Sequence, residues 1–336
     1  MSGNATPRQI VQELLEGVAP QRPLFLPIIF SHGARIESVP LRIFLASPTK
    51  ISNAARQIRA RLRADGITCY FDSFLEAEAL GGVLEWDRDG QVASLLWPND
   101  PASLETDALD DPAKRGRIGL AIEVIRRLKS VMREDCLLSA AVAGPFTIAS
   151  LLAQLDRGRK AHVRDLSVSS LDLATALISP MAKAFVEAGA NVLFLHEEIL
   201  PVLSEEDCAD WAARVATAIN IVRFYRALPV LLLTDAGSAA ANRNVILRQS
   251  WDCVVCLPLD GLAPPEKQTV QTWDPARFGI ALPPESFQAA TWRQTSLTPS
   301  FASALRDWRP AVVTTAGDLP SALDIQRLNE VWENLQ

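Results

Sequence analysis

Polar side chains follow several short apolar runs in this sequence, and these residues are the first candidates for chemistry. An apolar run of about 4 to 8 residues is typical of a buried strand, so the polar residue after it lies where a strand ends. Carboxylates at such places can bind cations or transfer protons, and histidines and cysteines can also bind metals. The candidates are Ser31, His32, Arg35, Asp72, His196, Glu197, Glu198, Thr234, Asp235, Cys256, Asp260, Thr314 and Thr315.

Asp72 is the strongest single candidate, because it directly follows the apolar run at residues 67–71. A structural role for this carboxylate would require a helix N-terminus or a charged partner nearby. A carboxylate at the end of a buried strand can instead hold a cationic or amide group, or move a proton if its pKa is tuned. We favour the functional role.

Two of the three histidines, His32 and His196, also fall at the ends of predicted strands. Each could serve a site or simply hydrogen-bond a loop, and both interpretations stay open. The third, His162, lies in a charged segment and is expected to be solvated.

The pair Cys253-x-x-Cys256 could suggest a metal or redox site. Residues three apart on a strand point to opposite faces, so the two thiols cannot easily bind one metal ion. Free cysteines are also common in protein cores. We therefore favour buried thiols without a metal, and keep Cys256 as a substrate contact.

Apolar strands and amphipathic helices alternate along the whole chain. Helices are predicted over residues 7–18, 48–64, 165–188, 204–227 and 322–335, and strands over 23–30, 67–71, 136–142, 191–195, 229–233, 253–257, 277–282 and 310–314. Strands that are apolar throughout are covered on both faces, as parallel strands are. About eight such units predict a single (β/α)8 TIM barrel domain over residues 1–336, entered by an N-terminal helix, with its active site at the carboxyl ends of the strands.

The segment 84–110 interrupts this alternation with Trp86, Trp97, several aspartates and the turn at residues 98–101. We expect an insertion after the second strand. A functional loop and a tolerated surface addition both remain open. Residues 283–308 form a second irregular stretch.

Composition narrows the class of protein. The chain has 336 residues, 49% of them hydrophobic, and a net charge of -6 without a basic tract, so no nucleic-acid or membrane partner is expected. No apolar run approaches the roughly 20 residues that span a bilayer. Five scattered cysteines and a polar N-terminus indicate reduced thiols and a cytoplasmic protein. No dinucleotide fingerprint, phosphate loop or nucleophile elbow is present.

Two segments carry a resemblance to a known family. Residues 70–81 read YFDSFLEAEALG, and residues 143–150 read AGPFTIAS. Both resemble segments of the uroporphyrinogen decarboxylase superfamily, the first a segment of its corrinoid-linked methyltransferases and the second a segment shared across the superfamily. Residues 317–328 are similar to its last strand-to-helix passage. The segment at residues 187–194, which contains most of the predicted strand 191–195, precedes the position of its central acidic residue, here Glu197. Together with the strand-end positions, the resemblance implies a barrel with catalytic Asp72, Glu197 and His196, and with substrate- or cofactor-binding His32, Arg35, Glu76, Phe146, Thr234, Asp235 and Cys256.

Departures from the superfamily narrow the chemistry. Its decarboxylases hold substrate carboxylates with arginines near the first strand, of which only Arg35 is kept here, so porphyrinogen decarboxylation is not expected. Its methyltransferases bind zinc through a His-x-Cys pair and a later cysteine. The matching positions are Thr234, Ala236 and Gly317, so zinc is not expected at the usual site and no metal ligands are assigned.

The resemblance therefore implies an enzyme that moves a methyl group between a small methylated substrate and a corrinoid or tetrahydrofolate-type acceptor. Asp72, Glu197 and one histidine would protonate the leaving group or position the substrate. A corrinoid protein is the expected partner, and a homodimer is the expected assembly. Two alternatives remain: a decarboxylase-type lyase that acts on a small carboxylic acid bound near Arg35, and a non-catalytic relative that binds a ligand.

Overall fold

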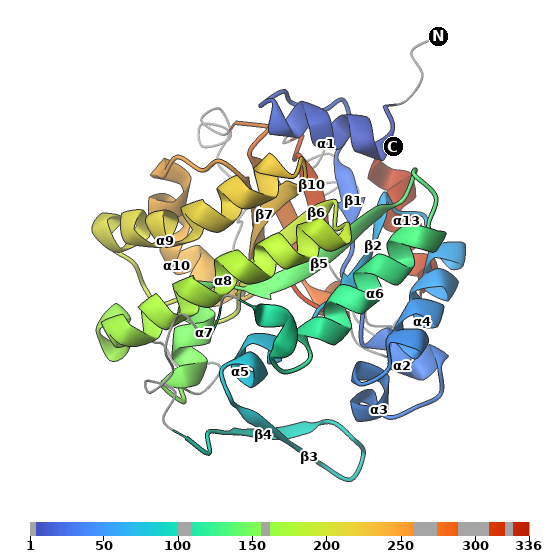
Figure 1. The fold of residues 1–336 in the computed structure, drawn as a ribbon. Helices are drawn as coiled ribbons and strands as arrows, with labels where there is room; N and C mark the ends of the chain where they lie inside the picture. The colour runs from blue at the N-terminus through green and yellow to red at the C-terminus, as the bar shows by residue number, and fades with distance from the viewer. Residues whose placement is uncertain are drawn as a thin grey trace.

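Eight parallel strands form the wall of a barrel in the computed structural model of this chain (Figure 1). The structure describes residues 5–99, 109, 111–155, 162–258, 274–287, 309–319 and 325–335. In chain order the wall consists of β1 (Leu24–Leu26), β2 (Gly66–Tyr70), β5 (Leu137–Ala143), β6 (Val192–Glu197), β7 (Leu228–Leu233), β8 (Val254–Pro258), β9 (Phe278–Leu282) and β10 (Val312–Thr315). The predicted TIM barrel is confirmed.

The hydrogen-bonded order runs from β1 through β10, β9, β8, β7, β6 and β5 to β2. The ring is thus completed where β1 faces β2, and this seam has no regular strand ladder. Asp65 joins the two sides: its amide donates to the Phe25 carbonyl at 3.0 Å, and its carboxylate accepts from the Phe25 amide at 2.8 Å. Arg22 binds the same carboxylate at 2.8 Å. Nearer the strand ends, the Thr68 hydroxyl lies 3.5 Å from the Pro27 carbonyl.

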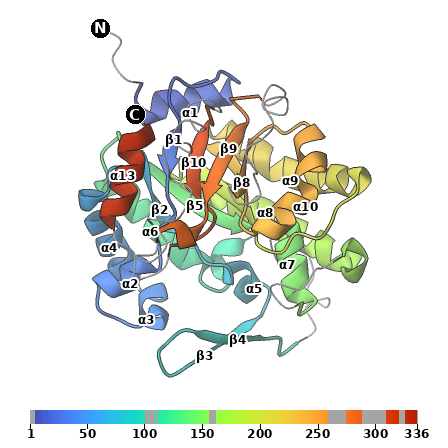
Figure 2. The same ribbon diagram turned by 180° about the vertical axis from the view of Figure 1, so that it is seen from behind.

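Helices cover the outside of the wall (Figures 1 and 2). Ser204 caps α9 (Glu205–Phe224) in a reciprocal capping box with Asp207, and acidic residues fill its first turn. The long helices are α4 (Pro48–Arg61), α6 (Ile118–Val131), α8 (Val168–Ala188), α9 (Glu205–Phe224), α10 (Ala236–Arg248) and α13 (Ile325–Leu335).

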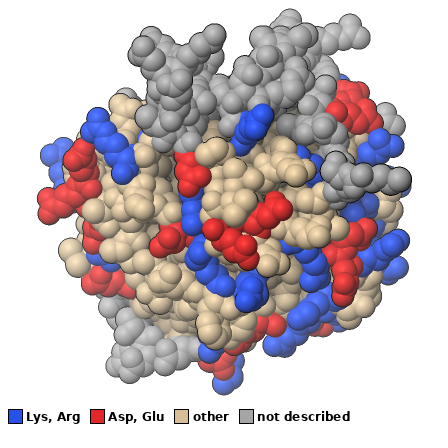
Figure 3. Space-filling model, turned by 90° about the horizontal axis from the view of Figure 1, so that it is seen from above, with Lys and Arg blue, Asp and Glu red and all other residues tan. Residues whose placement is uncertain are grey.

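Helix α1 (Pro7–Leu15) lies at the end of the barrel where the strands begin, and buries Ile10, Val11 and Leu14. Figure 3 views the molecule from this end and shows acidic and basic side chains interspersed on its surface. No helix in the described part of the chain is long and apolar enough to cross a bilayer.

The first strand is shorter than predicted, because Pro27 has no amide hydrogen to extend the ladder. Two short helices, α2 (His32–Ile36) and α3 (Leu41–Leu45), follow it. Sequence periodicity did not predict them, since each is little more than one turn.

The predicted insertion after the second strand is present. Helix α5 (Leu75–Ala79) leads into an antiparallel hairpin of β3 (Val83–Trp86) and β4 (Val92–Leu96). The Trp97 indole donates to the Leu151 carbonyl at 3.2 Å, which ties the hairpin to α7 (Pro145–Leu152). Most of residues 100–110 and 288–308 lie outside the described residues. Figure 1 shows that the hairpin extends from the end of the barrel where the strands finish.

Candidate functional site

The carboxyl ends of β2 and β6 bring several predicted site residues together. The Ser73 hydroxyl donates a short hydrogen bond to Glu198, and His196 Nδ1 lies 3.7 Å from the same carboxylate. The ring of Phe71 lies against the His196 ring, with centroids 4.8 Å apart. The segment around Asp72 and the strand end at His196 thus lie together at the mouth of the barrel, which is the end where the strands finish. Their places at strand ends predicted this.

Arg117 neutralises Asp72 and was not found by sequence reasoning. Asp72 Oδ2 lies 2.6 Å from Arg117 Nη1, while its other oxygen accepts from the Phe74 amide at 3.0 Å. Arg117 Nε also binds Glu78 at 2.6 Å, and Nη1 donates to the Tyr70 hydroxyl at 3.0 Å. One signal was available: Arg117 is the N-cap of α6, where the helix dipole disfavours a cation unless a partner is near.

Burial and charge act against each other in this network. Burial alone would lower the pKa of Arg117, but Asp72, Tyr70 and Glu78 raise it above its ordinary value. Burial raises the pKa of Glu78, and Arg117 opposes that rise. Arg117 therefore stays charged, and the group works as one unit of a cation with two carboxyls and a phenol.

The Glu197 side chain lies beside the N-terminus of α7, on the outer face of the barrel wall. Its carboxylate accepts from the Phe146 amide at 3.2 Å, the Thr147 amide at 2.8 Å and the Thr147 hydroxyl at 2.6 Å. The same hydroxyl accepts from the Glu198 amide at 2.9 Å. Burial raises the pKa of Glu197 to about 7, opposed by the bonds from Thr147 and Phe146. This geometry favours a positioning role, in which Glu197 fixes the loop that carries Glu198.

The residue before α7 is Gly144, and only a glycine fits against Glu197. A Cβ added at Gly144 would lie 2.3 Å from Cδ and Oε1 of Glu197. The Phe146 ring is fully buried against Trp211, at a centroid distance of 6.1 Å. The Phe146 amide, and not its ring, therefore contributes to the hydrogen bonds around Glu197.

Glu76 is fully buried on α5, one turn after Asp72. Its Oε1 accepts from the Ala143 amide at 2.9 Å, whereas Oε2 has no hydrogen-bond partner among the described residues. Burial raises the pKa of Glu76 to about 8, and the charges of Asp72 and Glu198 add to the rise. Glu76 is therefore a carboxylic acid, not a carboxylate, near neutral pH.

Asp318, a carboxylate absent from the sequence predictions, organises the opposite side of the mouth. It accepts from the Phe30 amide at 2.7 Å and the Ser31 amide at 2.8 Å, directly before α2. Burial raises the pKa of Asp318 to about 6, opposed by hydrogen bonds from Ser31 and Phe30. His32 is buried at the start of α2, and Arg35 is exposed in its last turn.

The remaining predicted residues have local structural contacts. The Thr234 hydroxyl donates to the Glu197 carbonyl at 3.2 Å. Asp235 is exposed and caps α10 by accepting from the Ser238 amide at 2.6 Å. Asp260 lies outside the described residues, and His162 is exposed, as predicted.

Cys256 is fully buried in the barrel wall. A Cβ added at Gly279 would lie 2.3 Å from its sulfur, so the thiol fills the space that this glycine leaves. Burial raises the pKa of Cys253 to about 12, and burial, with the Cys253 thiol nearby, raises that of Cys256 well above its ordinary value. Neither side chain is a thiolate at neutral pH, as a nucleophile or metal ligand must be.

All five cysteines are buried as free thiols. We therefore expect the folded protein to give almost no reaction with a thiol reagent at pH 7.5, and the denatured protein to give five equivalents. Rapid labelling of one thiol in the native state would contradict the buried placement. Labelling each Cys→Ser variant in turn would identify the exposed group.

The residues at the superfamily's zinc positions do not fit a zinc ion. Thr234 donates its hydroxyl to a carbonyl, Ala236 begins α10, and Gly317 has no side chain. Among the described residues, no group of three or more His, Cys, Asp or Glu side chains is placed to hold a metal ion.

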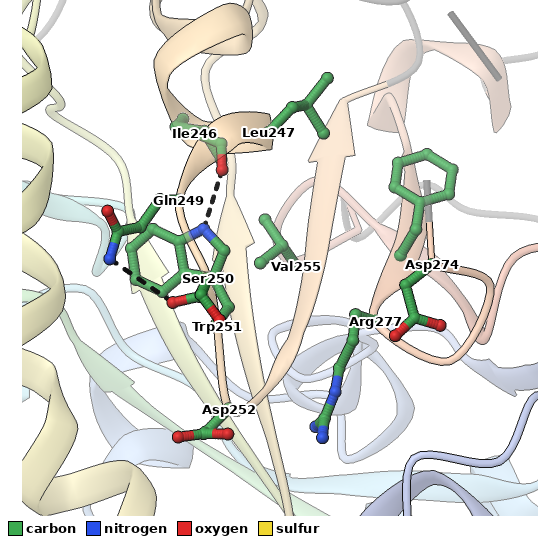
Figure 4. A pocket seen from close by; sticks show the side chains of 10 residues that line it. Ile246, Leu247, Gln249, Ser250, Trp251, Asp252, Val255, Asp274 and Arg277 are labelled. Carbon is green, nitrogen blue, oxygen red and sulfur yellow. Dashed lines mark hydrogen bonds between the residues drawn. The ribbon is translucent and has the colours of Figure 1, made fainter. Parts of the chain in front are cut away.

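A cavity of about 290 Å³ lies at the end of the barrel where the strands begin, away from the residues described above (Figure 4). It is formed by the segments that enter β8 and β9, and Trp251, Val255 and Phe278 line it. The Trp251 indole donates to the Ile246 carbonyl at 2.9 Å. Because active sites of such barrels lie where the strands end, we place the site at the mouth and not in this cavity.

Comparisons with known proteins agree with this architecture. The sequence pattern of the family described as uroporphyrinogen decarboxylase (URO-D) matches residues 6–233. One relative, the methylcobamide:CoM methyltransferase MtaA of Methanosarcina barkeri, is 26% identical over 194 residues, which are 56% of this chain. The match spans about half, 54%, of that relative's length. A solved methyltransferase from Methanosarcina mazei has the same fold, with a TM-score of 0.72 at 14% identity over 98% of each chain.

Proposed function

We propose that this chain, which belongs to the uroporphyrinogen decarboxylase family, transfers a methyl group from a small methylated substrate to a corrinoid or tetrahydrofolate-type acceptor. The similarity to a methylcobamide:CoM methyltransferase supports this activity over decarboxylation. The observation that carries the proposal is the pairing of Arg117 with Asp72 and Glu78. A cation neutralised in this way is poorly suited to hold a substrate with many carboxylates.

In this proposal, the methyl donor binds at the mouth of the barrel and is protonated there. When a methyl group leaves a neutral oxygen, nitrogen or sulfur atom, that atom must gain a proton. Glu198 and His196 lie 3.7 Å apart at the end of β6 and supply groups that can hold and move this proton. Asp72, fixed by Arg117, orients the substrate, and Glu197 positions the Glu198 backbone through Thr147.

A corrinoid would supply the nucleophile that receives the methyl group. The barrel interior does not fit such a ring, because strand side chains such as Leu26, Cys256 and Thr314 are buried there. We therefore propose that the acceptor approaches the mouth from outside, carried by a corrinoid protein.

The test is a methyl-transfer assay with purified protein, a reduced corrinoid and a panel of small methyl amines, ethers and thioethers. We expect one donor class to methylate the corrinoid. We expect Asp72→Asn to lower kcat/KM by about 100-fold or more, in the range of lost proton-transfer or positioning groups. The loss of the corrinoid's reduced absorbance would report the rate.

Asp172→Asn is the matched control, because Asp172 is also a carboxylate paired with an arginine but is exposed on α8. It should leave the rate unchanged. Absence of transfer and of donor binding by the folded wild-type protein would overturn the proposal and favour a non-catalytic, ligand-binding role.

A further inference from the structure

Ser73 lies at the mouth of the barrel, and the proposed function gives it no role. It belongs to the loop after β2, and its hydroxyl donates a hydrogen bond to Oε1 of Glu198, which belongs to the loop after β6. The same oxygen lies 3.7 Å from Nδ1 of His196. One carboxylate oxygen therefore contacts both the Ser73 hydroxyl and the imidazole that the proposed reaction uses.

The backbone around Ser73 is itself held in place. Asp72 Oδ1 accepts from the Phe74 amide at 3.0 Å, which closes a turn with Ser73 at its centre. Asp72 Oδ2 lies 2.6 Å from Nη1 of Arg117, so the turn is tied to the start of α6. The Ser73 hydroxyl is thus presented to Glu198 from a turn that a buried ion pair restrains.

The backbone on the other side of this contact is held as well. Thr147 Oγ1 accepts from the Glu198 amide at 2.9 Å and from the Ile199 amide at 3.3 Å. Further along the same loop, the buried Asn242 accepts from the Leu203 amide at 2.8 Å. These bonds hold main-chain amides, whereas the hydrogen bond from the Ser73 hydroxyl acts on the Glu198 carboxylate itself.

We propose that Ser73 is a positioning residue that holds the Glu198 carboxylate beside His196, so that this pair is in place to protonate the atom that loses its methyl group. The inference rests on the proposed methyl transfer. Glu198 is 16% exposed, so without Ser73 its side chain would turn more readily towards the solvent. Such a loss matters, because a misplacement of about 1 Å can cost about 100-fold in rate.

Ser73 exchanges no proton with the substrate in this scheme. The bond between the methyl carbon and the donor heteroatom breaks, and its electron pair stays on the heteroatom. The acceptor, a reduced corrinoid or equivalent nucleophile, supplies the electron pair of the new bond to carbon. The heteroatom takes the proton held by the His196–Glu198 pair, and water at the mouth returns a proton to the pair.

The positioning can be measured without any enzymatic assay, by following the ring signals of the three histidines by NMR as the pH is varied. A carboxylate held near an imidazole favours its protonated form, so Glu198→Gln should lower the pH midpoint of His196 by about one unit. Ser73→Ala should lower this midpoint too, and should add nothing in the Glu198→Gln background. The exposed His162 is the internal reference. An unchanged or raised His196 midpoint in Ser73→Ala would overturn the inference.

Catalysis gives a second readout. Ser73→Ala should lower kcat by about 10- to 100-fold with KM little changed, because the substrate still binds while the proton-transfer pair is misplaced. Ser73→Thr keeps the hydroxyl and should retain most of the activity. Ser94→Ala is the matched control: Ser94 also donates to a glutamate, Glu85, at 2.5 Å, but on the exposed hairpin, so its loss should leave kcat unchanged.

The outcomes separate this inference from the proposed function. Equal losses of kcat in Ser73→Thr and Ser73→Ala would show that the hydroxyl is not the cause, and would overturn the inference. A wild-type kcat in Ser73→Ala would also overturn it, while the proposed methyl transfer would stand. If the His196 midpoint responds to Ser73→Ala but the wild-type protein transfers no methyl group, the proposed function fails and the positioning of Glu198 by Ser73 stands.

Discussion

Replacing Arg117 by methionine is expected to lower the free energy of unfolding by about 3–5 kcal/mol, because it leaves two carboxylates without their cation. The side chains of Asp72 and Glu78 are only 7% and 18% exposed. Removing one partner of a buried ion pair leaves a charge that water cannot reach, and that penalty exceeds the value of the pair itself. Denaturant unfolding followed by circular dichroism measures the loss.

Two further variants separate this explanation from lost packing. Asp72→Asn combined with Arg117→Met should recover a large part of the stability, because one of the uncompensated carboxylates is gone. Arg127→Met on the same helix removes an exposed ion pair with Glu123 and should cost less than about 1 kcal/mol. Equal losses at Arg117 and Arg127 would show that burial of the network contributes nothing.

Gly144→Ala is expected to destabilise the protein by about 3 kcal/mol or more. The new Cβ would lie 2.3 Å from the Glu197 carboxyl, which cannot retreat without breaking its bonds to Phe146 and Thr147. Overpacking costs about 1–3 kcal/mol, and each buried group left without a hydrogen bond adds about 1–3 kcal/mol. Thermal and denaturant unfolding should both report the change.

Gly237→Ala is the matched control, since Gly237 also lies at the start of a helix that follows a strand. Its added Cβ would meet only Asp235 Oδ2, at 3.3 Å, so the change should stay within about 1 kcal/mol. Combining Gly144→Ala with Glu197→Ala should cost less than the sum of the two, because both act on one contact. Additive costs would show that the clash with Glu197 is not the cause.

The fold could be predicted from the sequence because short, mostly apolar strands alternate with helices, and several of these strands end at polar residues. That rule also placed Asp72 and His196 at one mouth. It did not distinguish His196 from Glu197, although neighbouring residues on a strand point to opposite faces. Strand alternation alone predicts that only one of the two can face the barrel interior, and Glu197 is found at α7 instead.

Other parts of the site depend on contacts between distant segments. Arg117 reaches Asp72 from the N-cap of α6, 45 positions later, and Asp318 reaches the loop after β1 from the segment that follows the last strand. No local pattern predicts such pairings, since tertiary packing decides them. Asp235 is the opposite case: a carboxylate three residues before Ser238 at the start of a helix is a capping signal, which strand-end reasoning overlooked.

The seam between β1 and β2 has a consequence for solubility. In hydrogen-bonding terms the wall is an open sheet, whose two edge strands are turned towards each other. Unpaired edge strands can recruit strands of other chains and cause aggregation. Here β1 is only three residues long and is flanked by Pro23 and Pro27, which have no amide hydrogen to offer. If the seam opened, the edge of β1 would be a poor template for another strand.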